Sequence, residues 1–139
     1  MRRGYTLLEQ LVVLTVFAIL LTIVGPRTLT ALDRSAVRNA RIQLVSVLGA
    51  ARGSAQSRAE KVSVSMDSTA GLLRILAGAD TLLVRPLQTE LGVAFAASRD
   101  NVTYGASGRG YGAANSIIVL SRGAAAETVY VARLGRARW

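Results

Sequence analysis

The sequence opens with Met1-Arg2-Arg3-Gly4-Tyr5-Thr6-Leu7-Leu8-Glu9-Gln10, a short basic segment that leads directly into an apolar one. From Leu11 to Val24 no residue carries a charge, and the apolar run ends at Gly25-Pro26. Counted from Tyr5, the stretch has about 20 residues, enough for a helix of roughly 30 Å that crosses the hydrocarbon core of a bilayer. We therefore predict a membrane-spanning helix over residues 5–26.

The charges around this segment predict its orientation. Arg2 and Arg3 precede the span, so the positive-inside rule places the N-terminus in the cytoplasm. An ordinary secretory signal would carry a small-residue cleavage site of the Ala-x-Ala type after its apolar region, and no such site stands at Gly25. We therefore expect a single-pass membrane segment that is not removed as a secretory signal.

Glu9 is the one charged residue between Tyr5 and Val24. A carboxylate inside a membrane segment costs on the order of 3 kcal/mol on insertion scales, and such residues usually have a partner and a role. Two interpretations follow. Glu9 either lies at the level of the lipid headgroups and is tolerated there, or it pairs with a cation from another chain.

The segment from Arg2 to Glu9 with the apolar run behind it resembles the N-terminal motif of type IV prepilins and type II secretion pseudopilins. The resemblance implies that a prepilin peptidase cleaves after Gly4 and methylates the new N-terminal residue, Tyr5. It implies that Glu9 neutralises the N-terminal amine of a neighbouring subunit during assembly. Pro26 matches a helix-loosening proline that members of this family often carry.

The same resemblance implies partners and a location. The partners are other pilin or pseudopilin subunits, the prepilin peptidase, the inner-membrane assembly platform and, before assembly, membrane lipid. The head lies in the periplasm while the chain spans the inner membrane, and it then joins a periplasmic pseudopilus or a cell-surface pilus.

A helical pattern continues from residue 27 to residue 59. Small and apolar side chains recur at three- and four-residue spacing and form a stripe that suits packing on a sheet, at Ala36, Ala40, Leu44, Val47, Leu48, Ala51 and Ala55. Five arginines fall within about 60° of an ideal helical wheel, at Arg27, Arg34, Arg38, Arg41 and Arg52. They form either a solvated face or contacts with acidic faces of neighbouring subunits. Pro26 is the expected kink site, and Gly49 and Gly53 each weaken the helix by about 1 kcal/mol.

Residues 60–139 show the pattern of a β-rich head. Short apolar or β-branched runs alternate with Gly, Asp, Ser and Asn and predict strands at 62–66, 72–76, 82–87, 93–96, 102–104, 116–120 and 128–134. Pro86 ends its strand or lies at a sheet edge. Because strands follow a helix without βαβ alternation, the fold class is α+β with a small antiparallel sheet. The expected parts are a leader at 1–4, the apolar helix at 5–26, an amphipathic helix at 27–59 and the head at 60–139, the layout of a pilin.

Composition argues against catalysis. The chain has 139 residues, of which 51% are hydrophobic, and a net charge of +9 from 17 basic and 8 acidic side chains. It contains no histidine and no cysteine, so the commonest general base and all thiolate chemistry are missing. We expect no enzymatic activity, no cofactor and no metal site.

A glycine-rich segment runs from Gly105 to Ala113. Gly108, Gly110 and Ala113 match the spacing of the dinucleotide-binding fingerprint. That fingerprint must open a helix, whereas a predicted strand follows here, so we interpret the segment as a loop between strands.

The chain ends with Arg133-Leu134-Gly135-Arg136-Ala137-Arg138-Trp139. Arginine forks match phosphate groups bidentately, and a terminal Trp139 could stack on an exposed base. The alternative is a terminal strand with exposed arginines and a frayed end.

The head resembles the GspH/FimT family of minor pilins and pseudopilins. The shared features are an Ala-Arg segment in the helix, a glycine-rich turn before Ile117-Ile118-Val119-Leu120, and a closing Val129-x-Val131 strand followed by Gly135-Arg136-Ala137-Arg138. In FimT-type minor pilins this tail is implicated in DNA capture during natural transformation. The resemblance thus implies DNA contacts by Arg136 and Arg138, with Arg133 and Trp139 as further candidates. A purely structural minor pseudopilin of a type II secretion system, without DNA binding, is the alternative function.

The role of Glu9 gives a first testable prediction. Glu9→Ala or Glu9→Leu should leave membrane insertion intact and block incorporation into a filament, because the amine of the neighbouring subunit then stays uncompensated in an apolar fibre core. Membrane fractionation measures the first property and co-purification with filaments measures the second. Normal co-assembly of either variant would contradict this role.

Overall fold

The computed structural model describes residues 6–112 and 114–139, of which residues 23–26 are described by their backbone alone. The chain divides into two compact units, Met1–Leu32 and Asp33–Trp139. Helix α1 (Leu7–Arg58) contributes to both units. Its first part belongs to one unit, and its second part belongs to the unit that contains the head.

Helix α1 begins with a side-chain cap. The Thr6 hydroxyl accepts a hydrogen bond from the backbone N–H of Glu9 at 3.3 Å, as an N-cap residue does. Thr6-Leu7-Leu8-Glu9 has the sequence of a capping box, in which the glutamate stands at the third helical position. The observed bond uses the backbone of Glu9, and its side chain stands in the first turn, where a capping box would place a glutamate.

The first part of α1 exposes apolar side chains on all sides. Leu7, Leu14 and Leu21 are 85%, 68% and 69% exposed. This is the one helix among the described residues that is long and apolar enough to cross a membrane, with a mean hydropathy of 2.5 over its 18-residue window. An exposed apolar surface of this kind needs lipid or other chains to cover it.

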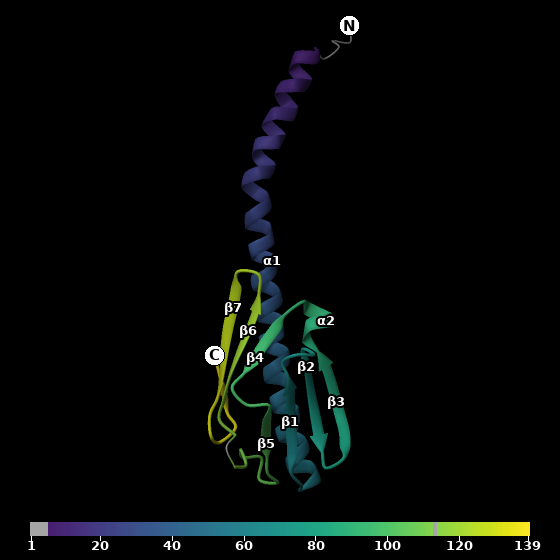
Figure 1. Ribbon diagram of the computed structural model, residues 1–139, viewed down its shortest axis with the longest axis vertical. Coiled ribbons are helices and arrows are strands. Elements are labelled where there is room, and N and C mark those ends of the chain that lie inside the picture. Colours follow the sequence, from purple (N-terminus) through teal and green to yellow (C-terminus); the bar gives the residue numbers. More distant parts are fainter. Residues whose placement is uncertain (1–5, 113) are drawn as a thin grey trace. The chain divides into compact units, whose positions relative to one another are not determined.

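Two antiparallel sheets build the head, which is richer than the single sheet expected from the sequence (Figure 1). The first, sheet A, has the order β3-β2-β1-β5, and the second, sheet B, has the order β4-β6-β7-β8. Their elements, in chain order, are β1 (Val62–Asp67), β2 (Leu72–Ala77), β3 (Asp80–Pro86), the short helix α2 (Leu87–Leu91), β4 (Ala94–Ala97), β5 (Asn101–Tyr104), β6 (Ser116–Arg122), β7 (Ala125–Val131) and β8 (Ala137–Arg138).

Each strand predicted from the sequence is present, although several ends are shifted, and three of these shifts have a clear cause in the fold. The third strand stops at Pro86 rather than at Leu87, because Leu87 is fully buried as the first residue of α2. Gly92 ends α2 in the left-handed conformation, so the fourth strand begins at Ala94 rather than at residue 93. The last predicted strand stops at Val131 instead of continuing to Leu134, because the chain turns back there to form β8.

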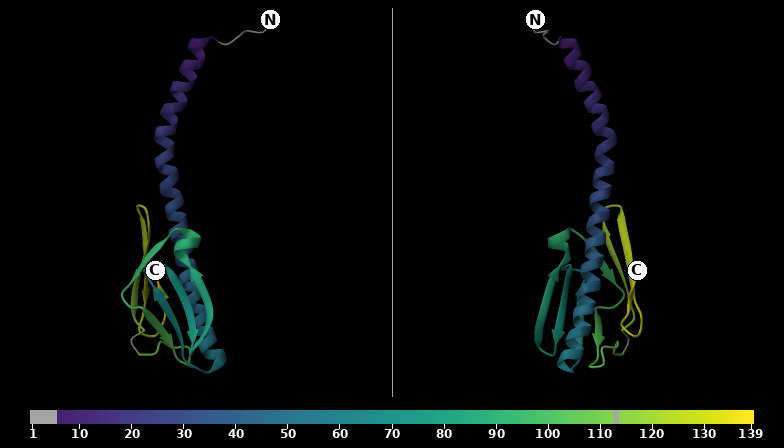
Figure 2. Two further views of the ribbon diagram at one scale, coloured as in Figure 1. Left: turned by 45° about the vertical axis from the view of Figure 1, so that its right-hand side comes forward. Right: turned by 180° about the vertical axis from the view of Figure 1, so that it is seen from behind.

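The second half of α1 supplies the centre of the core. Every residue of the predicted stripe is buried, which confirms the stripe: Ala36, Ala40, Leu44, Val47, Leu48, Ala51 and Ala55. The inner faces of both sheets join the same cluster, through Val62 and Val64 of sheet A and Ile118 and Val129 of sheet B. Seen from behind in Figure 2, this part of α1 lies between the two sheets. The helix continues through Gly49 and Gly53 because burial of its stripe outweighs their low helix propensity.

The arginines on one face of α1 differ in their exposure and in their contacts. Arg34 and Arg38 are exposed, as expected for a solvated face. Arg41 instead pairs with Glu127 of β7 at 3.2 Å, and Arg52 is half-buried. Arg41 and Arg52 are therefore partly covered by the head and are not part of a fully solvated face.

Candidate functional site at the C-terminal strand

The C-terminal tail is a strand of the fold. β8 pairs antiparallel with β7, so that Arg138 lies directly opposite Tyr130. The strand interpretation of the tail is thus confirmed for residues 137–138. The candidate arginines are all exposed to solvent, at Arg133, Arg136 and Arg138.

A tight turn places β8. The backbone N–H of Ala132 donates to the carbonyl of Arg136 at 2.8 Å, and that of Gly135 donates to the carbonyl of Ala132 at 2.7 Å. Gly135 has a φ of +79°, and a Cβ at this position would overlap the ring of Tyr104. The Tyr104 hydroxyl donates to the Gly135 carbonyl at 3.0 Å. Glycine is therefore required here both by the backbone conformation and by the approach of the ring.

The glycine-rich segment supports this turn from the other side. Its Gly110 donates its backbone N–H to the carbonyl of Leu134 at 3.1 Å, and a Cβ on Gly110 would overlap the carbonyl of Arg133. The segment leads into strand β6, as predicted, and so lacks the helix that a dinucleotide site requires. It holds the tail in place.

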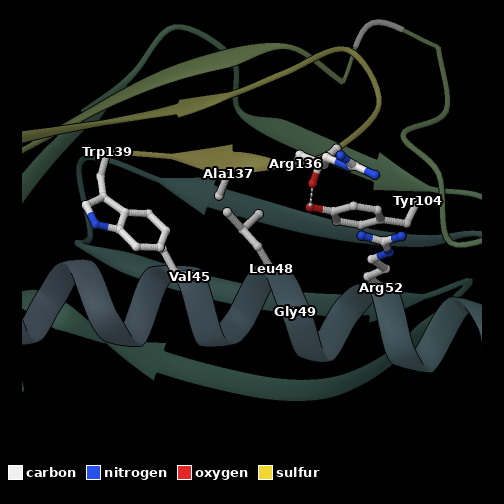
Figure 3. Close-up of a pocket in the computed structure, with 9 residues that line it drawn as sticks. Val45, Leu48, Gly49, Arg52, Tyr104, Arg136, Ala137 and Trp139 are labelled. Atoms are coloured by element: carbon white, nitrogen blue, oxygen red, sulfur yellow. Dashed lines mark hydrogen bonds between the residues drawn. The ribbon is translucent and has the colours of Figure 1, made fainter.

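A groove of about 500 Å³ runs between α1 and β8 (Figure 3). Val45, Leu48 and Gly49 of α1 form its floor, and Ala137 faces them from β8. One end is bordered by Arg52, Tyr104 and Arg136, and the other by Trp139.

The arginine end of the groove carries two positively charged side chains, Arg52 and Arg136. Within the described part of the chain, neither Arg52 nor Arg136 has an acidic group within 4.0 Å. Burial raises the pKa of Tyr104 to about 12, although the Arg52 guanidinium acts in the opposite direction. Tyr104 is therefore a neutral hydrogen-bond donor at physiological pH and does not offset the two arginines.

The other end of the groove is aromatic. Trp139 is 65% exposed, and the Arg41 guanidinium lies over its ring at 5.4 Å from the centroid. Because Arg41 also pairs with Glu127, it orients the indole ring while its own charge is balanced.

The structure brings some candidate residues together and separates others. Arg136 and Trp139 line the groove, whereas Arg138 is placed beside Tyr130 and Arg133 lies in the turn. Sequence reasoning did not place Arg52 or Tyr104 in this site. The available signal was that Arg52 borders the buried stripe of α1. Among residues 6–112 and 114–139, no three acidic side chains gather as a metal site would need.

The N-terminal candidates are only in part within the described residues. Gly4 and Tyr5 lie outside them, as does the side chain of Pro26. Glu9 lies exposed in the first turn of α1. Its pairing with a neighbouring amine and the kink at Pro26 stay predictions.

Two comparisons with known proteins concern the N-terminal motif and the fold. Residues 1–25 match the family model of the prokaryotic N-terminal methylation motif, so the chain carries the processing motif of prepilins. Its fold is that of a type IV minor pilin, as in two crystal forms of the minor pilin FimU of Pseudomonas aeruginosa PAO1. The first form gives a TM-score of 0.63 at 18% identity over 76% of this chain and 88% of FimU. The second gives 0.58 at 17% identity over 76% and 90%.

No curated protein matches the sequence significantly. The methylation motif and the minor-pilin fold agree with the resemblance to the GspH/FimT family.

Tyr104 gives a prediction for stability against pH. Its pKa is about 12 in the folded head, against 10.0 ordinarily, so its neutral form stabilises the fold below pH 10. That contribution should be lost as the pH rises from 10 to 12, lowering the free energy of unfolding by about 2–3 kcal/mol. Tyr104→Phe should show no such fall and should cost about 1 kcal/mol at neutral pH because the hydrogen bond to Gly135 is removed.

Denaturant unfolding of the unit Asp33–Trp139, which contains the whole buried core, measures this effect. The two proteins differ at this residue alone, so the difference between their pH profiles isolates Tyr104. An identical fall in the Tyr104→Phe variant would contradict the assignment.

Proposed function

We propose that the chain is a minor subunit of a type IV pilus, cleaved after Gly4, methylated at Tyr5 and anchored through the first part of α1 before assembly. The observation that carries the proposal is the combination of the methylation motif at residues 1–25 with a head of minor-pilin fold. The exposed apolar surface of α1 supports it, because a filament core of packed helices would cover that surface. In this proposal the N-terminus is cytoplasmic and the head periplasmic before assembly.

The partners follow from the same proposal. The prepilin peptidase and the inner-membrane assembly platform act on the chain, and other pilin subunits surround α1 in the filament. Lipid covers α1 beforehand. Glu9 compensates the amine of a neighbour, since an unpaired amine and an unpaired carboxylate are both costly in an apolar surrounding. Pro26 is the proposed point where α1 loosens.

The cap of α1 allows a sharper test of Glu9 than its replacement by alanine or leucine. Glu9→Gln keeps the side-chain length and the residue type that a capping box accepts, but removes the charge. It should insert into membranes like the wild type and fail to enter filaments. Thr6→Ala is the matched control, because it removes the cap seen at 3.3 Å and keeps the carboxylate, and it should still enter filaments.

Quantitative immunoblots of sheared filaments, normalised to the membrane pool, measure both variants. Incorporation of Glu9→Gln at the wild-type level would show that capping, and not charge pairing, explains this glutamate.

We further propose that the head binds DNA through the surface around β8, with a role in natural transformation. The exposed Arg133, Arg136 and Arg138 supply guanidiniums, and Arg52 adds a fourth from α1. Two exposed aromatic rings, Trp139 and Tyr130, lie beside them. Arginines interleaved with aromatic rings favour a nucleic-acid partner. The alternative is a purely structural minor pseudopilin of a type II secretion system.

Salt dependence separates these two functions. The head should bind duplex DNA without sequence preference, and its affinity should fall steeply with salt. Arg136→Ala combined with Arg138→Ala should weaken binding and reduce the log–log salt slope by about 0.9 for each phosphate that the variant no longer neutralises. Fluorescence anisotropy over a salt series measures both quantities.

Arg74→Ala combined with Arg85→Ala is the control, because it removes the same charge from exposed positions on sheet A. If the control matches the tail variant, only net charge matters. If the wild-type head binds no DNA at low salt, the purely structural function remains.

A further inference from the structure

The groove between α1 and β8 differs in chemistry along its length. Arg52 and Arg136 form one end, an apolar floor of Val45 and Leu48 follows, and Trp139 closes the other end (Figure 3). A surface that only attracted duplex DNA would need the charge but not the floor or the aromatic end.

The arginine end suits a phosphate group. Arg52 is half-buried, so its guanidinium is held near the groove rather than free in solvent. Tyr104 stays neutral beside it and donates a hydrogen bond to the Gly135 carbonyl. Arg52 and Arg136 lie on either side of the Tyr104 ring (Figure 3), and neither has a carboxylate partner in the described part of the chain. Each guanidinium can therefore offer charge-assisted hydrogen bonds to phosphate oxygens from its own side of the ring.

The aromatic end suits a base. Arg41 covers one face of the Trp139 ring and leaves the side chain 65% exposed. Because Arg41 is paired with Glu127, it brings no unpaired positive charge to this end of the groove. Stacking of a nucleobase on such a ring is tolerant of sequence.

The space between the two ends is left open by a glycine. A Cβ at Gly49 would meet no atom within 4 Å, although the residue lines the groove. Arg136 and Trp139 lie three residues apart on an extended segment, about 10 Å along the strand. A larger side chain at position 49 would fill this gap.

We propose that the groove binds one nucleotide of a single-stranded DNA, with its phosphate at the end that Arg52 and Arg136 border and its unpaired base against Trp139. The inference rests on the proposed DNA function and names its substrate class. A base in a duplex must leave its stack before it can enter such a groove. The chain therefore prefers single-stranded over duplex DNA.

Two glycines of the same helix provide the test. Gly49→Phe fills the groove, whereas Gly53→Phe is the matched control, because its Cβ is equally open and the residue does not line the groove. Both changes replace glycine in a helix by a residue of higher helix propensity, and circular dichroism checks that both variants fold. The full chain in detergent is titrated with a fluorescent oligothymidine and with a duplex of the same length.

Gly49→Phe should weaken binding of the single strand about tenfold, the effect of removing one stacked base, and should leave the duplex affinity within about twofold. Trp139→Ala should reproduce that weakening without changing the salt slope. Gly53→Phe should bind like the wild type.

Three results would overturn the inference. Equal affinity for both DNA forms, unaffected by Gly49→Phe, would leave the proposed DNA function standing and remove the nucleotide groove. Absence of binding to either form would remove both. Unchanged binding of single strands together with loss of filament incorporation in Gly49→Phe would identify a neighbouring subunit as the occupant.

Discussion

One continuous helix has to satisfy two different apolar surroundings, and the rest of the molecule depends on this constraint. The first part of α1 exposes its apolar side chains, among them Leu7 and Leu21, and needs lipid or neighbouring helices to cover them. The second part buries a stripe from Ala36 to Ala55 under two sheets. Only the second part can carry polar residues on its outer face, because the first part needs an apolar surface on all sides. The sequence therefore changes from uniformly apolar to amphipathic along a single helix.

The tail depends on a second, local constraint. The hydrogen bond from Tyr104 to the Gly135 carbonyl and the hydrogen bond from Gly110 to Leu134 hold the turn that precedes β8. The arginine-containing tail after β7 thereby forms the edge strand β8, which pairs with β7. The glycine-rich loop acquires a structural explanation, because larger residues at positions 110 and 135 would overlap the atoms that fix the turn. The geometry of the proposed DNA surface is therefore set by the core.

The sequence predicted the features that repeat locally. The buried stripe of α1 follows from helical periodicity, and the strands follow from runs of β-branched residues between turn residues. It did not predict the division into two sheets, because strand pairing is non-local. It offered the terminal strand β8 only as an alternative, because so short a strand has no pattern. The groove combines Arg52 with Tyr104 and Arg136, which only the tertiary fold brings together. The cap at Thr6 was visible in the sequence as Thr-x-x-Glu and was missed.

The mass of the N-terminal peptide of the protein isolated from cell membranes and filaments tests the central claim most directly. The account predicts a peptide that begins with Tyr5 and carries one methyl group on its amine. It places that same modified peptide in the filament fraction. A filament-associated chain that retains Met1–Gly4, or one that begins with an unmodified Tyr5, would contradict the proposal that this protein is processed and assembled as a pilin.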